Sequence, residues 1–389
     1  MSDLETLSCK YYTQNVCRSC SWLQKTQSIQ IQEKEAILRH SLAFLGDFQL
    51  LESSRSELQA FRNRTKWIVT GSIEKAIIGI AGKENLDEGS DLIDCPILHP
   101  KIIELTKALT PLIAKYKLTP YSIGNRTGEL KGLIVFYSPL SEELYLRFVL
   151  RSTESVSRIN KLVSSLQKQF SGLKSVSANI QPIPQAILEG EKEIFFSEQR
   201  FVTHVLPTDH GQIALKLSPR AFVQSNAECA NKLYQRASEW IKVARPKRML
   251  ELYCGQGAFS FYSAPHAEEI LGIELNTEAV SVANETAKEH GFNNMRFLAA
   301  DASLVSKEIF KFAADLILVN PPRRGLAQSA IDILTAKPKD FIYSSCSHES
   351  LATDLKLFKE NYTVVKAQIF DMFPHTAHFE TLIWLRRNS

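Results

Sequence analysis

The sequence predicts an α/β protein whose carboxyl-terminal half is a Rossmann-like domain, preceded by an α+β domain and an amino-terminal cysteine motif. Three observations predict this fold. Beyond residue 246, short apolar runs with strand character alternate with helical patterns, which is typical of a doubly wound parallel sheet. The first of these runs ends in a Gly-x-Gly turn, a common feature of the first strand in such sheets. Before residue 216, strand-like runs and helices mix without regular alternation.

The elements of the carboxyl-terminal domain follow one another in a regular order. A helix is predicted over 226–243, because its apolar residues recur at the spacing of one helix face. A second helix is predicted over 277–290, between two strand runs. Strands are predicted at 248–253, 269–274, 295–299, 316–319, 340–344, 364–369 and 381–385. We therefore assign residues 216–389 to a Rossmann-like domain.

The chain before residue 216 is divided into two parts. Residues 1–65 form an amino-terminal segment, in which a polar helix is predicted over 27–44. Residues 66–215 are predicted to form an α+β domain with substantial antiparallel sheet. Its strands are expected at 67–70, 132–137, 144–150 and 175–180, and its helices at 100–116 and 156–170.

Composition and charge exclude some classes of protein. The chain of 389 residues contains 46 Lys and Arg against 42 Asp and Glu, a net charge of +4 that neither demands nor excludes a polyanionic partner. Its longest apolar runs are far shorter than the ~20 residues of a membrane-spanning helix. The first ten residues include Asp3 and Glu5 and no apolar signal-peptide core. We expect a cytoplasmic protein with neither a membrane partner nor an obligate protein partner.

The seven cysteines are unevenly distributed, and three of them crowd the first 20 residues as Cys9-x7-Cys17-x2-Cys20. An odd number of cysteines without an export signal argues against a disulfide framework, and clustered thiols in a reducing compartment usually hold a metal. Thiolate spacing alone suits an iron–sulfur cluster or a structural zinc equally well. Cys229 is expected on the solvent-leaning side of its helix, and Cys254 is expected to serve packing.

Residues able to bind a nucleotide follow the first three predicted strands of the Rossmann-like domain. Gly255 and Gly257 allow a tight turn and the close approach of a ligand. Glu274 ends the second strand, where a carboxylate can accept both hydroxyls of a ribose from NAD, FAD or S-adenosylmethionine. Asp301 ends the third strand, where an acid often lies near an adenine amino group. The alternative interpretation is a tight turn beside a surface Glu, and Ser260 in place of a third glycine counts against NAD.

The later strands end in residues that could act on a substrate. Two prolines stiffen the loop after Asn320 and direct this side chain toward the strand ends. Many methyltransferases that modify an amino nitrogen follow Asn-Pro-Pro with an aromatic residue, so Arg323 at this position disfavours an amino acceptor. Cys346 would face the same crevice, or else be a buried structural thiol. A metal site formed by His375, His378 and Glu380 is a remote alternative, because no helix supports it.

Together these residues resemble the bacterial RNA uracil-C5 methyltransferases, which use S-adenosylmethionine. The resemblance covers the whole carboxyl-terminal half of the chain in the family's order. The matching blocks are Ser218-x3-Phe222-x-Gln224-x-Asn226, Glu251-Leu252-Tyr253-Cys254-Gly255-x-Gly257-x-Phe259, Gly272-Ile273-Glu274, Val319-Asn320-Pro321-Pro322-Arg323-Arg324-Gly325, Tyr343-Ser344-Ser345-Cys346 and Asp371-x-Phe373-Pro374-x-Thr376-x-His378-x-Glu380.

The resemblance implies a set of residue roles. Cys346 would be the nucleophile that adds to carbon 6 of uracil, and Glu380 the base that removes the carbon-5 proton. Residues implied to bind S-adenosylmethionine are Gln224, Tyr253, Glu274 and Asn320. Many relatives carry Asp at the position of Asn320. The cysteines implied to hold a [4Fe–4S] cluster are Cys9, Cys17, Cys20 and Cys95.

The resemblance also indicates a substrate. The cysteines begin at Cys9, which leaves no room for the β-barrel RNA-binding module of some members, and the transfer-RNA enzymes lack the cluster. We therefore expect 23S ribosomal RNA as the partner, with Arg62, Arg64 and Lys66 either contacting phosphates or forming a solvated charge run. Alternatives are uracil in another RNA, an amino-group acceptor, a non-catalytic RNA-binding protein with a degenerate pocket, and a dehydrogenase.

Overall fold

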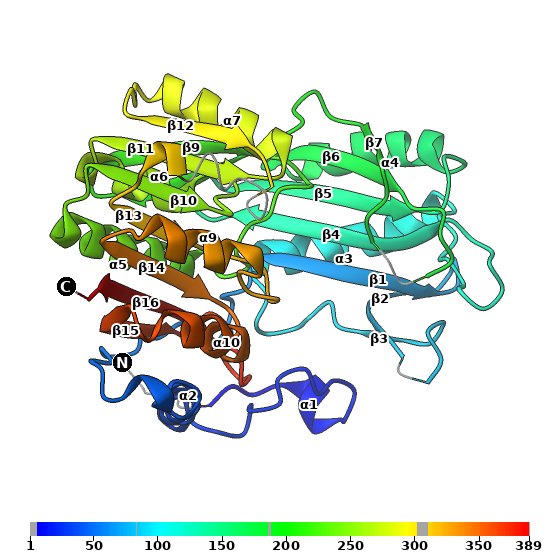
Figure 1. The fold of residues 1–389 in the computed structure, drawn as a ribbon. Helices are drawn as coiled ribbons and strands as arrows, with labels where there is room; N and C mark the ends of the chain where they lie inside the picture. Colours follow the sequence, from blue (N-terminus) through cyan, green and yellow to red (C-terminus); the bar gives the residue numbers. More distant parts are fainter. Residues whose placement is uncertain (1–5, 83, 186–187, 302–309, 389) are drawn as a thin grey trace.

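The computed structural model describes residues 6–82, 84–185, 188–301 and 310–388. Two seven-stranded sheets lie side by side, one formed by the carboxyl-terminal residues and one by the central residues. The amino-terminal segment runs along the bottom of the molecule in the view of Figure 1.

The carboxyl-terminal sheet has the strand order β12-β11-β10-β13-β14-β16-β15, and it confirms the predicted Rossmann-like fold. Each predicted strand is found within two residues of its expected ends. The strands are β10 (Arg248–Leu252), β11 (Glu269–Glu274), β12 (Met295–Ala299), β13 (Leu316–Val319), β14 (Asp340–Ser345), β15 (Tyr362–Phe370) and β16 (Glu380–Arg387).

The predicted parallel sheet is interrupted by one reversed strand, β16. Strands β10 to β14 pair in parallel, whereas β16 runs antiparallel to both β14 and β15. Only the nine residues 371–379 separate β15 from β16. A parallel crossover needs a dozen or more residues, so this connection forces the two strands into an antiparallel pair.

Helices cover both faces of this sheet. Alternate residues of one strand enter opposite cores, as Leu316 and Leu318 pack on the side of α5 while Ile317 and Val319 pack on the side of α10. The helices are α5 (Ala227–Ala244), α6 (Ala258–Ser263), the 3₁₀ turn η2 (Ala264–His266), α7 (Thr277–Glu289), α9 (Gln328–Ala336) and α10 (His348–Phe358).

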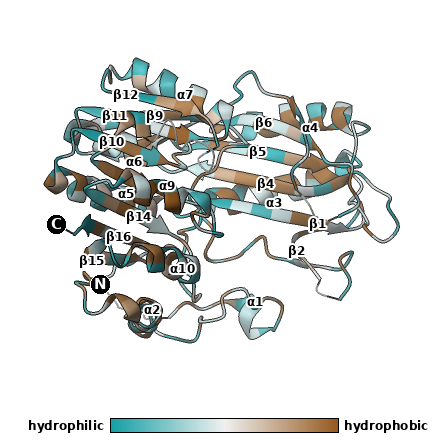
Figure 2. Cartoon of the chain, in the orientation of Figure 1, coloured by the Kyte–Doolittle hydropathy of each residue, from teal (hydrophilic) through white to brown (hydrophobic). Residues whose placement is uncertain are grey.

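The central sheet has the order β3-β2-β1-β4-β5-β6-β7 and is antiparallel except where α4 connects β5 to β6. Helices α3 and α4 pack on one face of it. Strand β4 is buried along its whole length and is among the more hydrophobic segments in Figure 2. The elements are β1 (Arg64–Gly71), β2 (Ala76–Ala81), β3 (Gly89–Asp91), α3 (Pro100–Lys115), β4 (Leu130–Ser138), β5 (Glu143–Leu150), α4 (Val156–Gln169), β6 (Leu173–Ile180) and β7 (Lys192–Phe195).

A two-stranded hairpin joins the two sheets. It consists of β8 (Val202–Thr208) and β9 (Gly211–Leu217). Val202 and Leu217 pack on the second face of the central sheet, while Leu206 and Leu215 pack into the core beneath α5. Because one hairpin contributes to both cores, the two sheets are held together by apolar contacts.

The amino-terminal segment packs on both domains: Tyr11 enters the core of the central sheet, and residues 27–54 pack on the carboxyl-terminal domain. It contains α1 (Lys10–Thr13), α2 (Gln27–Ser41) and the 3₁₀ turn η1 (Ala43–Leu45). Leu38 and Leu42 enter the same core as α10, which lies beside α2 in Figure 1. Residues 49–54 then follow the outer edge of β15, where the Leu51 N–H donates to the Ala367 carbonyl over 2.8 Å. Among the described residues, no helix has the length and apolar character needed to span a membrane.

Candidate active site

Strand register brings the two residues expected to act on a substrate together. Strand β14 ends at Ser345, which pairs with Thr381 in the antiparallel strand β16. Cys346 follows Ser345 and Glu380 precedes Thr381, so these two residues occupy the next position along the ladder. The last strand therefore carries a carboxylate back to the crevice at the carboxyl end of β14.

Charged and polar groups surround this pair. Burial, and then the charge of Glu380, raise the pKa of the Cys346 thiol, whereas Arg323 lowers it through its charge and a hydrogen bond. Burial also raises the pKa of the Glu380 carboxyl to about 8, against the charge of Arg323 and a hydrogen bond from Gln224. The buried Oε2 atom of Glu380 has no hydrogen-bond partner among the described residues. The site thus places a thiol and a carboxyl of raised pKa side by side, next to one guanidinium group.

The glycine turn after β10 lines a cavity together with Phe222 and Val223 of the loop 218–226. Gly255 has a φ of +55°, and a Cβ at this position would meet no described atom within 4 Å. Tyr253 also adopts a left-handed backbone, with a φ of +60°, and its hydroxyl lies 2.9 Å from Ser329 Oγ. Asn320, from the end of β13, lines the same cavity together with Tyr253 and Gly255. The cavity has the place expected for a cofactor in such sheets.

Glu274 ends β11 beside this turn, as the sequence predicts. Its Oε2 accepts a hydrogen bond from the Gly255 N–H over 3.0 Å, and its Oε1 accepts one from the Asn276 N–H over 2.9 Å. The carboxylate is only partly buried. It is therefore oriented by backbone donors while it remains accessible to a ligand.

The loop after Asn320 is held by a residue that the sequence analysis missed. Asp354, on α10, is buried and accepts hydrogen bonds from the Leu326 N–H over 2.9 Å and the Tyr343 hydroxyl over 2.7 Å. Gly325 has a φ of +83°, and a Cβ there would approach the Asp354 carboxylate to 2.6 Å. These contacts fix the loop that carries Arg323 toward Cys346. No local signal marks Asp354, which lies inside an ordinary amphipathic helix.

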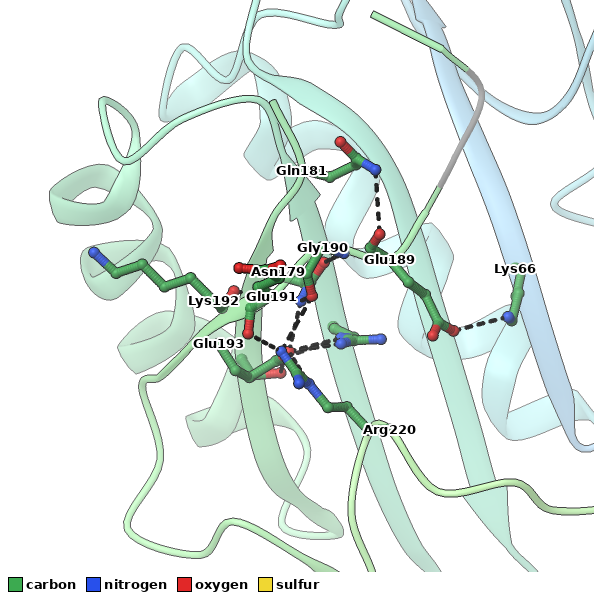
Figure 3. A network of polar contacts seen from close by, with 11 residues as sticks. Lys66, Asn179, Gln181, Glu189, Gly190, Glu191, Lys192, Glu193 and Arg220 are labelled. Carbon is green, nitrogen blue, oxygen red and sulfur yellow. Dashed lines mark hydrogen bonds and ion pairs between the residues drawn. The ribbon is translucent and has the colours of Figure 1, made fainter. Parts of the chain in front are cut away.

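The loop 218–226, which carries Gln224, is anchored to the central sheet by a polar network (Figure 3). Arg220 donates to the backbone carbonyls of Gly190 and Glu191 beside β7, and its Nε lies 3.5 Å from Glu193 Oε2. Glu193 is also bound by Arg147, with donor distances of 2.6 and 2.9 Å. Phe222, which lines the cavity, is 70% exposed. The central sheet therefore determines where this loop stands.

The four cysteines expected to hold a cluster gather near one another at the edge of the central domain. Cys9, Cys17 and Cys95 pack against its core. Burial, and then the neighbouring thiols Cys95, Cys17 and Cys9, raise the pKa of Cys20 to about 12, while the charge of Arg62 opposes this. Among the described residues, no three His, Cys, Asp or Glu side chains form a group that could hold a metal ion.

The structure corrects the expected exposure of Cys229 and bears on the two interpretations left open for the basic stretch. Cys229 is fully buried, because α5 packs against α6 and β8 as well as against β15 and β16. The basic stretch is not a uniformly solvated run, since the guanidinium of Arg62 donates to the Arg64 carbonyl and that of Arg64 donates to the Ala221 carbonyl. Lys66 is exposed and lies 3.1 Å from Glu189, as Figure 3 shows.

Comparison with known proteins identifies the family. The tRNA (uracil-5-)-methyltransferase family model matches residues 136–388. The chain is 37% identical to a 23S rRNA (uracil(747)-C(5))-methyltransferase of Xenorhabdus nematophila, over 97% of this chain and 99% of that protein. It is 38% identical to a protein of the same name from Yersinia pestis, over 98% of this chain and all of that protein.

The solved structures agree on the fold. The crystal structure of Pyrococcus abyssi tRNA (uracil-54, C5)-methyltransferase in complex with S-adenosyl-L-homocysteine superposes with a TM-score of 0.77. The match covers 94% of this chain and 85% of that chain at 23% identity, so it bears on architecture alone. The sequence resemblance stated above is thus confirmed by two full-length relatives and a family model that covers most of the chain. The chain belongs to the tRNA (uracil-5-)-methyltransferase family and is an RNA uracil-C5 methyltransferase.

Proposed function

We propose that this enzyme uses S-adenosylmethionine to form 5-methyluridine in 23S ribosomal RNA, through a covalent bond between Cys346 and carbon 6 of the target uracil. The observation that carries the chemistry is the pairing of Ser345 with Thr381, which makes Cys346 and Glu380 neighbours. The names of the relatives support the choice of RNA. A uracil in another RNA is the second candidate, because the family model is named for transfer RNA.

The reaction requires a nucleophile and a base. Carbon 5 of uracil is a weak nucleophile, and a thiolate that adds to carbon 6 turns the ring into an enolate with electron density on carbon 5. Cys346 is proposed to form this bond, with Arg323 lowering the pKa of its thiol. Glu380 is proposed to take the carbon-5 proton, after which the bond between carbon 6 and the Cys346 sulfur breaks.

The residues around the glycine turn fit S-adenosylmethionine. Gly255 faces open space and Glu274 presents a partly buried carboxylate beside it, as binding of a ribose requires. We propose that Gln224, Tyr253, Glu274 and Asn320 bind the cofactor. When bound, S-adenosylmethionine supplies an electrophilic methyl group. Gln224 also binds Glu380, so it would link the cofactor to the base.

Replacing Glu274 with Ala is expected to weaken S-adenosylmethionine binding by about 1.5–3 kcal/mol, because charge-assisted hydrogen bonds to the ribose are lost. Titration calorimetry measures this loss. Glu289→Ala is the matched control, since this residue is exposed and lies at the far end of α7. Equal affinity in Glu274→Ala and Glu289→Ala would place the ribose elsewhere.

Release of the methylated RNA is expected to slow below about pH 8. The base must be deprotonated to act, and burial holds the pKa of Glu380 near 8, so each pH unit below that value should cost about tenfold in the rate. Rapid double mixing, with adduct formation at one pH and its decay at another, isolates this step from the ionisation of Cys346. A decay rate that stays constant between about pH 6 and about pH 9 would remove Glu380 from this role.

The cysteine segment is proposed to hold a [4Fe–4S] cluster through Cys9, Cys17, Cys20 and Cys95. Mutual repulsion of these thiols indicates that they face one another, and Arg62 supplies a compensating positive charge. Thiolate ligands suit zinc as well as an iron–sulfur cluster, and the choice of the cluster rests on the family resemblance. The methyl transfer moves no net electrons, so a structural or RNA-positioning role is proposed for the cluster.

Protein purified without oxygen is expected to be brown and to contain about four iron and four sulfide per chain. Cys95→Ser should lose the colour and most of the soluble yield, because one corner of the cluster has no thiolate. Metal and sulfide analysis of both proteins tests this, with Cys254→Ser as the control thiol outside the segment. One zinc per chain without sulfide would rule out the cluster.

We propose a separate role for each of the three parts of the chain. Residues 1–65 carry three cluster cysteines, 66–215 contact RNA and supply Cys95, and 216–389 perform catalysis. The target base must leave its stack to reach Cys346, so we propose that it lies in an RNA loop, in the bacterial cytoplasm.

Mapping of methylated uridines in ribosomal RNA from a deletion strain tests the proposed function. Loss of one 5-methyluridine from 23S RNA, restored by the wild-type gene but not by a Cys346→Ala gene, is the expected result. Loss of 5-methyluridine from transfer RNA alone would establish the second candidate. A lost N-methyl group would favour an amino-group acceptor.

A further inference from the structure

The loop 371–379, which leads into Glu380, is held by the amino-terminal segment. It carries two polar residues that are completely buried, Asp371 and His375. The Asp371 N–H donates to the Ser54 carbonyl over 2.9 Å, and its side chain binds α2. The loop therefore depends on residues more than 300 positions away in the sequence.

The first side-chain contact is an ion pair in the core. Lys34 Nζ lies 2.5 Å from Asp371 Oδ1, and both side chains are 0% exposed. Lys34 also donates to the Phe373 carbonyl over 3.3 Å, so one ammonium group binds two points of the loop. A buried ion pair adds little net stability, but removal of one partner leaves an uncompensated charge. The pair therefore specifies where the loop lies.

The second contact surrounds His375. Its N–H donates to Gln30 Oε1 over 2.7 Å, and its carbonyl accepts from the Trp22 N–H over 2.8 Å. Its Nε2 lies 2.7 Å from the Leu58 carbonyl, so Nε2 carries the proton and Nδ1 faces the Gln30 amide at 3.5 Å. His375 has a φ of +66°, a conformation that persists in a residue other than glycine only when its surroundings impose it.

These contacts reach the catalytic pair. The loop determines where β16 begins, and Glu380 is its first residue. Among the described residues, its Oε2 has no hydrogen-bond partner, and the carboxyl is bound by the Gln224 side chain. Trp22 follows Cys20 by two residues, so the same bonds connect the cysteine segment to the loop.

We propose that Gln30 and Lys34 are positioning residues, which hold the loop 371–379 so that the Glu380 carboxyl meets the carbon-5 proton of the bound uracil. This inference rests on the proposed function of Glu380. It assigns to α2 a role in one step of the reaction, the resolution of the covalent adduct, rather than in binding of RNA or cofactor.

The test compares Gln30→Ala with Gln32→Ala, which removes the same side chain from the exposed face of α2. Gln30→Ala is expected to lower kcat by about 10- to 100-fold, because a displaced base transfers its proton slowly. KM for RNA and Kd for S-adenosylmethionine should match those of Gln32→Ala. On a denaturing gel, the methyl-labelled protein–RNA band should accumulate with ordinary RNA. His375→Asn, which tolerates the left-handed backbone but loses the bond to Leu58, should give the same pattern.

Two results would overturn the inference. One is a rate of adduct decay in Gln30→Ala and His375→Asn equal to that in Gln32→Ala. The other is a parallel loss of adduct formation, cofactor binding and thermal stability, which would mean that α2 only supports the fold. A measurement on the wild-type protein distinguishes failure of this inference from failure of the proposed function. Wild-type protein that forms no 5-methyluridine would refute the proposed function itself.

Discussion

Glu380→Gln is expected to leave the enzyme covalently attached to its RNA through Cys346. The amide keeps the shape of the carboxyl but cannot accept the carbon-5 proton, so carbon 6 should be attacked and carbon 5 methylated before the reaction stops. Product release should fall by about 10²–10⁴-fold, the usual contribution of a general base. A denaturing gel should then show a slow band that carries label from the methyl donor.

Glu360→Gln, an exposed carboxylate after α10, is the control and should release product at the wild-type rate. Normal turnover of Glu380→Gln would move the base to another residue. Absence of any adduct would mean that Glu380 acts earlier, for example in holding the pyrimidine.

Cys346→Ala is expected to abolish methyl transfer, by more than about 10³-fold, because the thiol proposed to add to carbon 6 is removed. Binding of RNA and S-adenosylmethionine should persist, since the loops that carry Glu274 and Gln224 are held by contacts that do not involve the thiol. RNA containing 5-fluorouridine should form a stable adduct with the wild type and none with the variant.

Cys229→Ala provides the matched thiol control. Cys229 is buried in the core, where burial raises the pKa of its thiol, so it should stay protonated and unreactive. This variant should still form the 5-fluorouridine adduct. An adduct that persists in Cys346→Ala would assign the nucleophile to a different cysteine.

Local sequence patterns predicted the elements well because they depend on near neighbours. The apolar run of β13 and the amphipathic pattern of α7 identify a strand and a helix whatever surrounds them, and both lie where predicted. The glycine turn and Glu274 were likewise predictable, since the ends of parallel strands meet at one edge of the sheet.

The burial of individual side chains and the groups to which they hydrogen-bond were less predictable, because both depend on segments far away in the chain. Cys229 was expected near solvent, but α6 and β8 cover the side of α5 that a two-layer packing would leave open. Arg62 and Arg64 form a basic stretch in the sequence, yet the fold turns both guanidinium groups toward backbone carbonyls. Asp354 and Arg220 carry no sequence signal for the loops that they hold.

The sequence by itself determined the strands of the carboxyl-terminal sheet, helices α5 and α7, the glycine turn and the family, all of which follow from local periodicity or from ordered motifs. Only the tertiary structure decided that Cys346 and Glu380 are neighbours. That contact requires β16 to return antiparallel between β14 and β15, because the nine residues 371–379 are too few for a crossover. The loop 371–379 is in turn held by α2, which binds Asp371 and His375 from the opposite end of the chain, and hydrophobic periodicity carries no information about such a partner.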